Sequence, residues 1–205
     1  MLLLYPEVFL SIDCGLDAAF SGRKDIYTDI LYVSDGPYVD GGENHRIKDE
    51  SAAGTDASLL TLRSFPSGLR NCYTLHTDSG EKYLVRMEFM YGNYDGKNTS
   101  SLHFDMHLGT NYWDTYQYVE ASAGYWWSEA IFVAWASWTP VCLVNTGGGT
   151  PFVSTLELRP LKAELYADAT TNQSMSTFSR GNMGATTLKR YVKIFFSALD
   201  RKSVV

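Results

Sequence analysis

Hydrophobic and polar residues alternate most regularly in two stretches of the chain, residues 82–90 and residues 101–109. In both stretches apolar side chains take every second position, which is the period of a β-strand with two different faces. The alternating apolar residues are Tyr83, Val85, Met87 and Phe89 in the first stretch and Leu102, Phe104, Met106 and Leu108 in the second. Residues 91–98 between them are rich in turn formers. The pattern therefore predicts strand, loop and strand, with the loop acting either as a ligand-binding loop at one end of a sheet or as the tip of an ordinary hairpin.

Further short strand patterns follow along the chain, separated by turns of Gly, Pro and Asp. They cover residues 8–13, 30–34, 59–63, 69–75, 112–119, 130–137, 141–144 and 152–158. Residues 45–57 are polar and irregular, which predicts a surface loop. With about ten short strands and almost no helical period, the chain is predicted to be all-β, an antiparallel β-sandwich or jelly roll. Residues 9–162 form the predicted sandwich, residues 1–8 an N-terminal remnant, and residues 163–205 an irregular, peripheral tail.

The composition is that of one soluble globular domain, because 45% of the 205 residues are hydrophobic and 20% are charged. The net charge of −6 argues against a nucleic-acid partner, since a phosphate backbone would be repelled and no cluster of Lys and Arg compensates. No run approaches about 18 consecutive apolar residues, so no transmembrane helix is predicted. Residues 1–4 are apolar but lack a basic flank, and are at most the remnant of a signal peptide.

The loop between the two strongest strands carries the candidate ligand-binding residues, Tyr91, Asn93, Tyr94 and Asp95. A sugar needs a ring face for its apolar side and polar groups for its hydroxyls, and this loop offers both. We therefore expect the loop to stand off the core, so that Tyr94→Ala and Asp95→Ala weaken ligand binding and leave stability nearly unchanged. Packing of the two tyrosine rings against the core is the alternative interpretation.

Three cysteines, Cys14, Cys72 and Cys142, leave one thiol unpaired if the other two form a disulfide, and all three pairings are open. None of them is spaced as a CxxC motif, which argues against a structural zinc site. Two sequons, at Asn98 and Asn172, predict N-glycosylation and passage through the secretory pathway.

Metal binding and catalysis find little support. His103, Asp105 and His107 share one strand face, but no third independent ligand accompanies the histidine pair, so we predict a solvated face and no metal. A glycosidase would need two carboxyl groups across a cleft, for which the candidates are Asp95, Asp105, Asp114 and Glu120. There is no GxSxG motif, and the glycines of residues 146–149 lie between two strands instead of opening a helix. We predict no enzymatic activity and no cofactor.

Several ordered segments resemble one known family. They are residues 9–15 (FLSIDCG), 32–35 (YVSD), 63–66 (RSFP), 70–73 (RNCY), 89–96 (FMYGNYDG), 104–109 (FDMHLG), 141–147 (VCLVNTG), 150–152 (TPF) and 156–161 (LELRPL). Together they resemble the malectin-like extracellular domain of plant leucine-rich-repeat receptor-like kinases, over residues 9–161.

The resemblance implies a β-sandwich related to carbohydrate-binding modules and a location outside the cell, at the plasma membrane in full-length relatives. Such relatives continue into a second malectin-like half, leucine-rich repeats, a membrane helix and a kinase. By this comparison residues 163–205 are either an irregular tail or the truncated start of a second half, and the chain is expected to be a truncated product. Tyr91 falls where malectin has a sugar-binding aromatic, whereas Gly92 and residues 148–151 depart from the malectin set.

The resemblance and the aromatic loop together predict a binding module that recognises a cell-wall carbohydrate or a secreted peptide, with receptor-kinase proteins as partners. The alternative is a structural or protein-interaction domain that binds no small ligand. A flat apolar patch would favour the alternative, and an aromatic cleft would favour the binding module.

Overall fold

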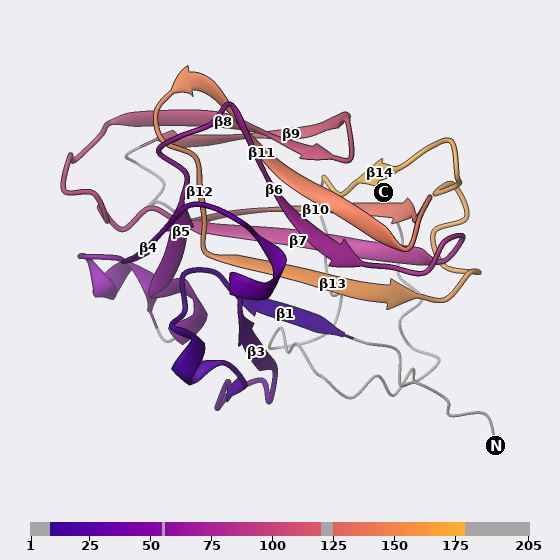
Figure 1. The fold of residues 1–205 in the computed structure, drawn as a ribbon, viewed down its shortest axis with the longest axis horizontal. Helices are drawn as coiled ribbons and strands as arrows, with labels where there is room; N and C mark the ends of the chain where they lie inside the picture. The colour runs from indigo at the N-terminus through magenta and orange to yellow at the C-terminus, as the bar shows by residue number, and fades with distance from the viewer. Residues whose placement is uncertain (1–8, 55, 120–124, 179–205) are drawn as a thin grey trace.

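The computed structural model describes residues 9–54, 56–119 and 125–178, and it shows two large β-sheets packed face to face with a third, small sheet at one end (Figure 1). The first sheet has seven strands in the order β14 (Met175–Ser176), β10 (Tyr125–Val133), β7 (Lys82–Met90), β13 (Thr155–Leu161), β1 (Leu10–Asp13), β3 (Leu31–Ser34) and β2 (Arg23–Lys24). The second has four, in the order β6 (Arg70–His76), β11 (Trp138–Gly148), β8 (Ser101–Leu108) and β9 (Asn111–Val119).

The small sheet holds β12 (Phe152–Val153), β5 (Thr61–Ser64) and β4 (Glu43–Arg46). The described residues also contain short 3-10 helices: η1 (Ala18–Phe20), η2 (Gly36–Tyr38), η3 (Glu50–Ala53) and η4 (Ala57–Leu59). The predicted all-β sandwich is confirmed. Within the described residues, no helix is long and apolar enough to cross a membrane.

An aromatic core lies between the two large sheets. Phe89 on β7 faces Phe104 on β8 with ring centroids 5.8 Å apart, and Tyr116 on β9 stacks on Phe104 at 4.9 Å. Phe152 is fully buried at the point where the small sheet closes this core. The alternating apolar positions of the strands thus meet across the sandwich, as their period requires.

The two strands with the clearest alternation lie in different sheets. β7 pairs with β10 and β13, whereas β8 pairs with β9 and β11. The hairpin interpretation is therefore wrong, and the loop after β7 crosses from one sheet to the other. The alternation could not reveal this, because two strands that face each other across a core show the same pattern as two neighbours in one sheet.

Strand β7 is buried on both faces, which its alternation of apolar and charged residues did not suggest. On the second face, the Lys82 ammonium donates hydrogen bonds to the carbonyl oxygens of Ala163 (3.0 Å), Leu165 (2.7 Å) and Tyr166 (2.9 Å). Ala169 packs there against Leu84 and Ile131, and β14 extends the sheet beyond β10. Residues 163–178 therefore cover part of this face. The domain boundary after residue 162 stays a prediction.

Most predicted strands are present, with shifted ends. The strand predicted at residues 130–137 runs from Tyr125 to Val133, and the one predicted at residues 59–63 begins at Thr61, after the turn η4. The predicted loop of residues 45–57 contains the end of β4 and the turn η3. β11 continues as far as Gly148, so part of the glycine-rich segment belongs to a strand. The predictions for residues 1–8 and 179–205 lie outside the described residues.

Candidate functional site

The predicted binding loop brings its four candidate residues together, but its two tyrosine rings point into the core. Tyr91 is 3% exposed and Tyr94 6% exposed, and both belong to the main core cluster. Their rings meet edge to face at 5.6 Å, and Tyr94 lies 5.5 Å from the ring of Phe152. The expectation that this loop stands off the core is wrong. Ligand binding by these residues stays a prediction, and the buried rings offer it no free face.

The polar groups of the loop hold one another in place. The Tyr91 hydroxyl donates to Asp95 Oδ1 at 2.6 Å, and the backbone amide of Lys97 donates to the same oxygen at 3.1 Å. Asn93 and Asn98 exchange two hydrogen bonds of 2.7 Å and 3.0 Å. Partial burial acts to raise the pKa of Asp95, but the hydrogen bonds from Tyr91 and Lys97 and the Lys97 charge outweigh it and lower that pKa. Asp95 thus stays ionised, and its hydrogen bonds link Tyr91 to Lys97 across the loop.

Gly92 is the position at which the loop departs from the malectin pattern. Its φ is +45°, and a Cβ built there would lie 2.5 Å from the Cβ of Ile47. A side chain at this position would need both an unfavourable backbone conformation and a displacement of Ile47. The aromatic neighbour that malectin places beside the residue matching Tyr91 therefore has no room here.

The burial of the tyrosines gives a stability test. Tyr94→Ala should lower the free energy of unfolding by roughly 2–3 kcal/mol, because it empties a buried ring site. Asp95→Ala should lower it by about 1 kcal/mol, since Asp95 is partly exposed and its loss removes one hydrogen-bond partner of Tyr91. Equilibrium unfolding in urea measures both. A Tyr94→Ala protein as stable as the wild type would contradict the buried position.

The disulfide joins Cys72 on β6 to Cys142 on β11, which lie directly opposite each other in register. Cys14 is the unpaired thiol, and it is completely buried. Burial, followed by the nearby Asp35 carboxylate, raises the pKa of Cys14 well above its ordinary value. This thiol therefore stays protonated and has little nucleophilic character.

The residues considered for metal binding or catalysis serve local contacts. His103 Nδ1 lies 3.0 Å from Thr146 Oγ1, and Asp105 accepts a hydrogen bond from Thr115 at 2.6 Å. Asp114 accepts one from Ser128 at 2.7 Å. In the described ranges no group of three or more His, Cys, Asp and Glu side chains converges on a point where a metal ion would fit. Glu120 lies outside the described residues.

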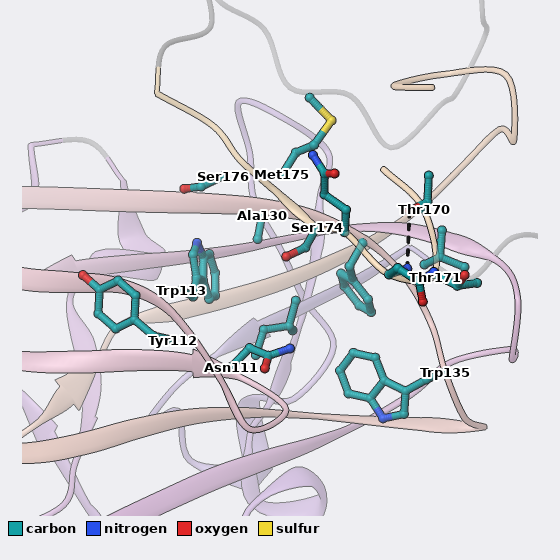
Figure 2. Close-up of a pocket in the computed structure, with 15 residues that line it drawn as sticks. Asn111, Tyr112, Trp113, Ala130, Trp135, Thr170, Thr171, Ser174, Met175 and Ser176 are labelled. Atoms are coloured by element: carbon teal, nitrogen blue, oxygen red, sulfur yellow. Dashed lines mark hydrogen bonds between the residues drawn. The ribbon is translucent and has the colours of Figure 1, made fainter. Parts of the chain in front are cut away.

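A pocket of about 300 Å³ opens at the other end of the sandwich, between the start of β9, the end of β10 and the segment that leads into β14 (Figure 2). We call it the edge pocket. It is far from the loop after β7, because the β10 residues that line it pair with the beginning of β7. Its lining residues are Leu108, Asn111, Tyr112, Trp113, Ala130, Phe132, Val133, Trp135, Thr170, Thr171, Asn172, Gln173, Ser174, Met175 and Ser176.

The edge pocket combines aromatic walls with a polar rim. Figure 2 shows Trp113 and Trp135 on two sides of it, with Asn111 between them and Ser174 across from Asn111. Trp135 is 49% exposed, whereas Trp113 is 8% exposed. None of the lining residues is an Asp, Glu, Lys, Arg or His. No sequence pattern indicated this site, because its parts come from three segments that only the fold brings together.

A charged row crosses the seven-stranded sheet on the face that points away from the sandwich core. The strand register places Glu129 (β10), Arg86 (β7) and Glu157 (β13) side by side. Arg86 Nε donates to Glu129 at 2.6 Å, and Thr155 donates to Glu88 at 2.9 Å. Burial, followed by the charge of Glu157, raises the pKa of Glu88 to about 7.

This raised pKa predicts that stability falls as the pH rises. The folded protein holds the Glu88 proton more tightly than the unfolded chain, whose Glu88 has an ordinary pKa near 4.5. The stabilisation is complete below about pH 4.5 and is lost as the pH passes through about 7. Between about pH 5.5 and about pH 8 the free energy of unfolding should drop by about 2 kcal/mol.

Thermal unfolding at a series of pH values measures this effect. Glu88→Gln, which cannot titrate, should flatten the pH profile. Part of the slope should remain, because burial also raises the pKa of Asp13, to about 6. A Glu88→Gln profile as steep as that of the wild type would show that other groups cause the dependence.

Comparison with known proteins agrees with the fold. The chain belongs to the malectin-like domain family, which it matches over residues 12–201. It is similar to the LRR receptor-like serine/threonine-protein kinase IOS1 of Arabidopsis thaliana, with 39% identity over 184 residues, which cover 89% of this chain and 20% of that protein. A probable LRR receptor-like kinase of the same plant is 46% identical over 153 residues, covering 74% of this chain and 17% of that protein.

Solved ectodomains of plant receptor kinases share the fold at low sequence identity. The ANX2 ectodomain from Arabidopsis thaliana matches with a TM-score of 0.66 and 12% identity, over 76% of this chain and 42% of that one. The plant receptor-like kinase FER matches with a TM-score of 0.65 and 17% identity, over 78% of this chain and 43% of that one. The chain thus spans about a fifth of the curated relatives it matches and less than half of the solved ectodomains.

Proposed function

We propose that this chain is a ligand-recognition module of an extracellular plant receptor, which binds a cell-wall carbohydrate or a secreted peptide and catalyses no reaction. Its family membership supports this proposal, since its curated relatives are receptor-like kinases. A second FER structure, with a TM-score of 0.60 and 14% identity over 76% of this chain and 40% of that one, is a complex with the plant peptide RALF23 and LLG2. By analogy, a peptide ligand and a partner protein are reasonable for this chain.

The edge pocket is the observation that carries the proposal. Pockets that bind small ligands are concave and largely aromatic or apolar, with a few polar groups that orient the ligand. The edge pocket has a suitable volume of about 300 Å³ and aromatic walls, although polar groups make up most of its exposed lining. Its lining residues include no Asp, Glu, His, Lys or Cys, so Tyr112 would have no side-chain partner in proton transfer to a bound molecule.

The proposal is tested by a binding screen on the secreted, glycosylated protein. The panel should contain neutral cell-wall oligosaccharides, acidic oligosaccharides and cysteine-rich secreted peptides, and calorimetry should report binding. We expect saturable binding by at least one class. No binding by any member at millimolar concentration would contradict a recognition function.

The loop after β7 is a second candidate surface of the same module. Its tyrosine rings are buried, but Asn93 and Asp95 are partly exposed and held in fixed positions. We propose that any contact with a ligand there is made by these polar groups. Asp95→Asn should then weaken binding of whichever panel member binds, and an unchanged affinity would remove the loop from the site.

The sequons at Asn98 and Asn172 are both exposed, and we propose that both carry N-linked glycans after secretion. Mass spectrometry of the secreted protein with and without peptide N-glycosidase measures their occupancy.

One observation favours the alternative of a protein-interaction domain. Four large apolar side chains are exposed on η1 and the β2–β3 hairpin, and they are Phe20 (64%), Ile26 (82%), Tyr27 (68%) and Leu31 (52%). These four residues lie within residues 20–31 of the chain, and exposed apolar patches are typical of surfaces that contact another protein. Ile26→Ser together with Leu31→Ser should abolish such a contact and leave ligand binding at the edge pocket unchanged.

A further inference from the structure

We propose that the disulfide between Cys72 and Cys142 is a thiol–disulfide exchange site, which a protein dithiol of the thioredoxin type reduces while the domain stays folded. In this reaction the dithiol attacks Cys72, and Cys142 leaves as a thiolate next to Arg70 and His107. None of these residues lines the edge pocket, so the exchange site is independent of the proposed recognition function. Three features support it: the position of the disulfide, the unequal burial of its two cysteines, and the positive charge beside Cys142.

The disulfide lies on the face of the four-stranded sheet that points away from the core. Tyr73 and Leu75 of β6 are fully buried in the core, so Cys72 points to the opposite face, as the alternation of a strand requires. β6 is an edge strand whose neighbour is β11. Cys72 is half-buried, whereas Cys142 on the interior strand β11 is completely buried. An attacking thiolate therefore approaches at Cys72.

Arg70 and His107 flank Cys142 on that face. The strand register places His107 of β8 directly opposite Cys142, on the side away from Cys72. Side chains at such opposite positions have Cβ atoms about 5 Å apart. Arg70 starts on β6 and ends on the far side of β11, where its Nη1 donates to His107 Nδ1 at 3.1 Å and its Nη2 donates to the Gly109 carbonyl oxygen. The Arg70 side chain therefore crosses β11 at Cys142.

The positive charge beside Cys142 favours the thiolate that reduction produces. A thiolate is stabilised next to Arg or protonated His, and exchange is faster when the leaving sulfur has a lower pKa. The Arg70 guanidinium is always charged, and its two hydrogen-bond acceptors, an imidazole nitrogen and a carbonyl oxygen, are neutral. Asp105 lies on the same face of β8, but it accepts a hydrogen bond from Thr115 of β9 at 2.6 Å, on the side away from β11.

The reaction is a two-electron exchange. A thiolate of the dithiol attacks Cys72 Sγ, the S–S bond breaks, and its electron pair leaves on Cys142 Sγ. The second thiol of the reductant then attacks the mixed disulfide and releases Cys72. The dithiol is thereby oxidised to a disulfide, both cysteines are reduced, and the two protons that the dithiol loses end on Cys72 and Cys142. Cys14 does not compete as a third thiol, because it is completely buried.

Reduction removes the covalent link between an edge strand and its neighbour. β6 is then held to β11 by backbone hydrogen bonds alone. The same strand carries Tyr73, whose hydroxyl donates to Asp35 at 3.0 Å, and Asp35 also accepts two hydrogen bonds from Arg63, at 2.5 Å and 2.7 Å. The redox state of the site therefore sets how firmly β6 holds its side of this buried polar cluster.

The test measures how fast dithiothreitol reduces the secreted full chain in increasing urea. Free thiols are alkylated at timed intervals and located by peptide mass spectrometry. We expect Cys72 and Cys142 to be reduced at a rate that stays constant up to half of the urea midpoint of unfolding. Reduction that requires global unfolding would instead speed up exponentially with urea, because the free energy of unfolding falls linearly with it. Such a rise, or a folded protein that resists reduction, would overturn the inference.

A trapped intermediate identifies the attacked sulfur. Thioredoxin whose second active-site cysteine is replaced by serine cannot complete the exchange and stops at the mixed disulfide. We expect the thioredoxin to be attached to Cys72, with Cys142 free and alkylated. Attachment to Cys142, or no mixed disulfide with the folded protein, would contradict the proposed site.

Variants test the role of the positive charge. Arg70→Gln should slow reduction about threefold or more, because the leaving thiolate loses its charged neighbour, and Arg70→Lys should keep most of the wild-type rate. His107→Gln should also slow it. His103→Gln is the matched control, since His103 lies on the same face of β8 but opposite Gly148 instead of a cysteine, and it should react like the wild type. An Arg70→Gln protein that is reduced as fast as the wild type or faster would overturn the inference.

Discussion

Replacing Phe152 by alanine is expected to lower the free energy of unfolding by about 3–5 kcal/mol, the usual loss for a buried phenylalanine. Phe152 is fully buried, and its ring centroid lies 5.4 Å from that of Tyr116, 5.8 Å from Phe104 and 6.0 Å from Phe89. These rings come from both large sheets, while Phe152 itself belongs to the small one. The cavity cannot close easily, because its walls are strands fixed by their own sheets.

Equilibrium unfolding in urea measures the change, and Phe178→Ala provides the matched control. Phe178 is fully exposed, so the same substitution there should change stability by less than about 0.5 kcal/mol. Should the two variants prove equally stable, Phe152 would not be at the centre of the core.

Loss of the disulfide should cost about 4 kcal/mol. Cys72 and Cys142 are 70 residues apart in sequence, and in the chain-entropy model closing a loop of that size restricts the unfolded chain by about this amount. Cys72→Ala together with Cys142→Ala should lower the unfolding midpoint to that of the reduced wild type.

A reductant distinguishes this effect from a packing change. Dithiothreitol should destabilise the wild-type protein and leave the double variant unaffected, because the variant has no bond to reduce. Cys14→Ala should keep the full response to reductant, since Cys14 takes no part in the disulfide. A wild-type protein indifferent to reductant would contradict the pairing.

The strand positions could be predicted from the alternation, but the way the strands assemble could not. β7 and β8 were both visible as alternating segments, yet they face each other across the core instead of pairing. The alternation predicted two different faces for β7, but it did not show that the charged face is buried. That face is buried because Arg86 has carboxylate neighbours in the strand on either side and Lys82 has carbonyl oxygens from residues 163–166. Such compensation depends on contacts between distant segments, which a local pattern does not contain.

The candidate site shows the same limit. Tyr91 and Tyr94 lie in a loop of turn formers, where exposure is the usual outcome, but the crossing between sheets directs both rings inward. The edge pocket had no sequence signal, since Trp113, Trp135 and Ser174 are far apart in the chain. Aromatic residues make up 14% of the chain, and this was the one hint of an aromatic pocket. Composition alone does not show where in the chain such a pocket lies.

The contacts of Lys82 bear on where a fragment of this domain can end. A chain that ended at residue 162 would lack the three carbonyl oxygens that accept hydrogen bonds from the Lys82 ammonium group. It would also lack β14, the strand that pairs with β10. Leu84 and Ile131 would lose Ala169 and become exposed to solvent. Recombinant forms of this domain, and any tag placed at the C-terminal end, should therefore keep the chain intact through residue 178.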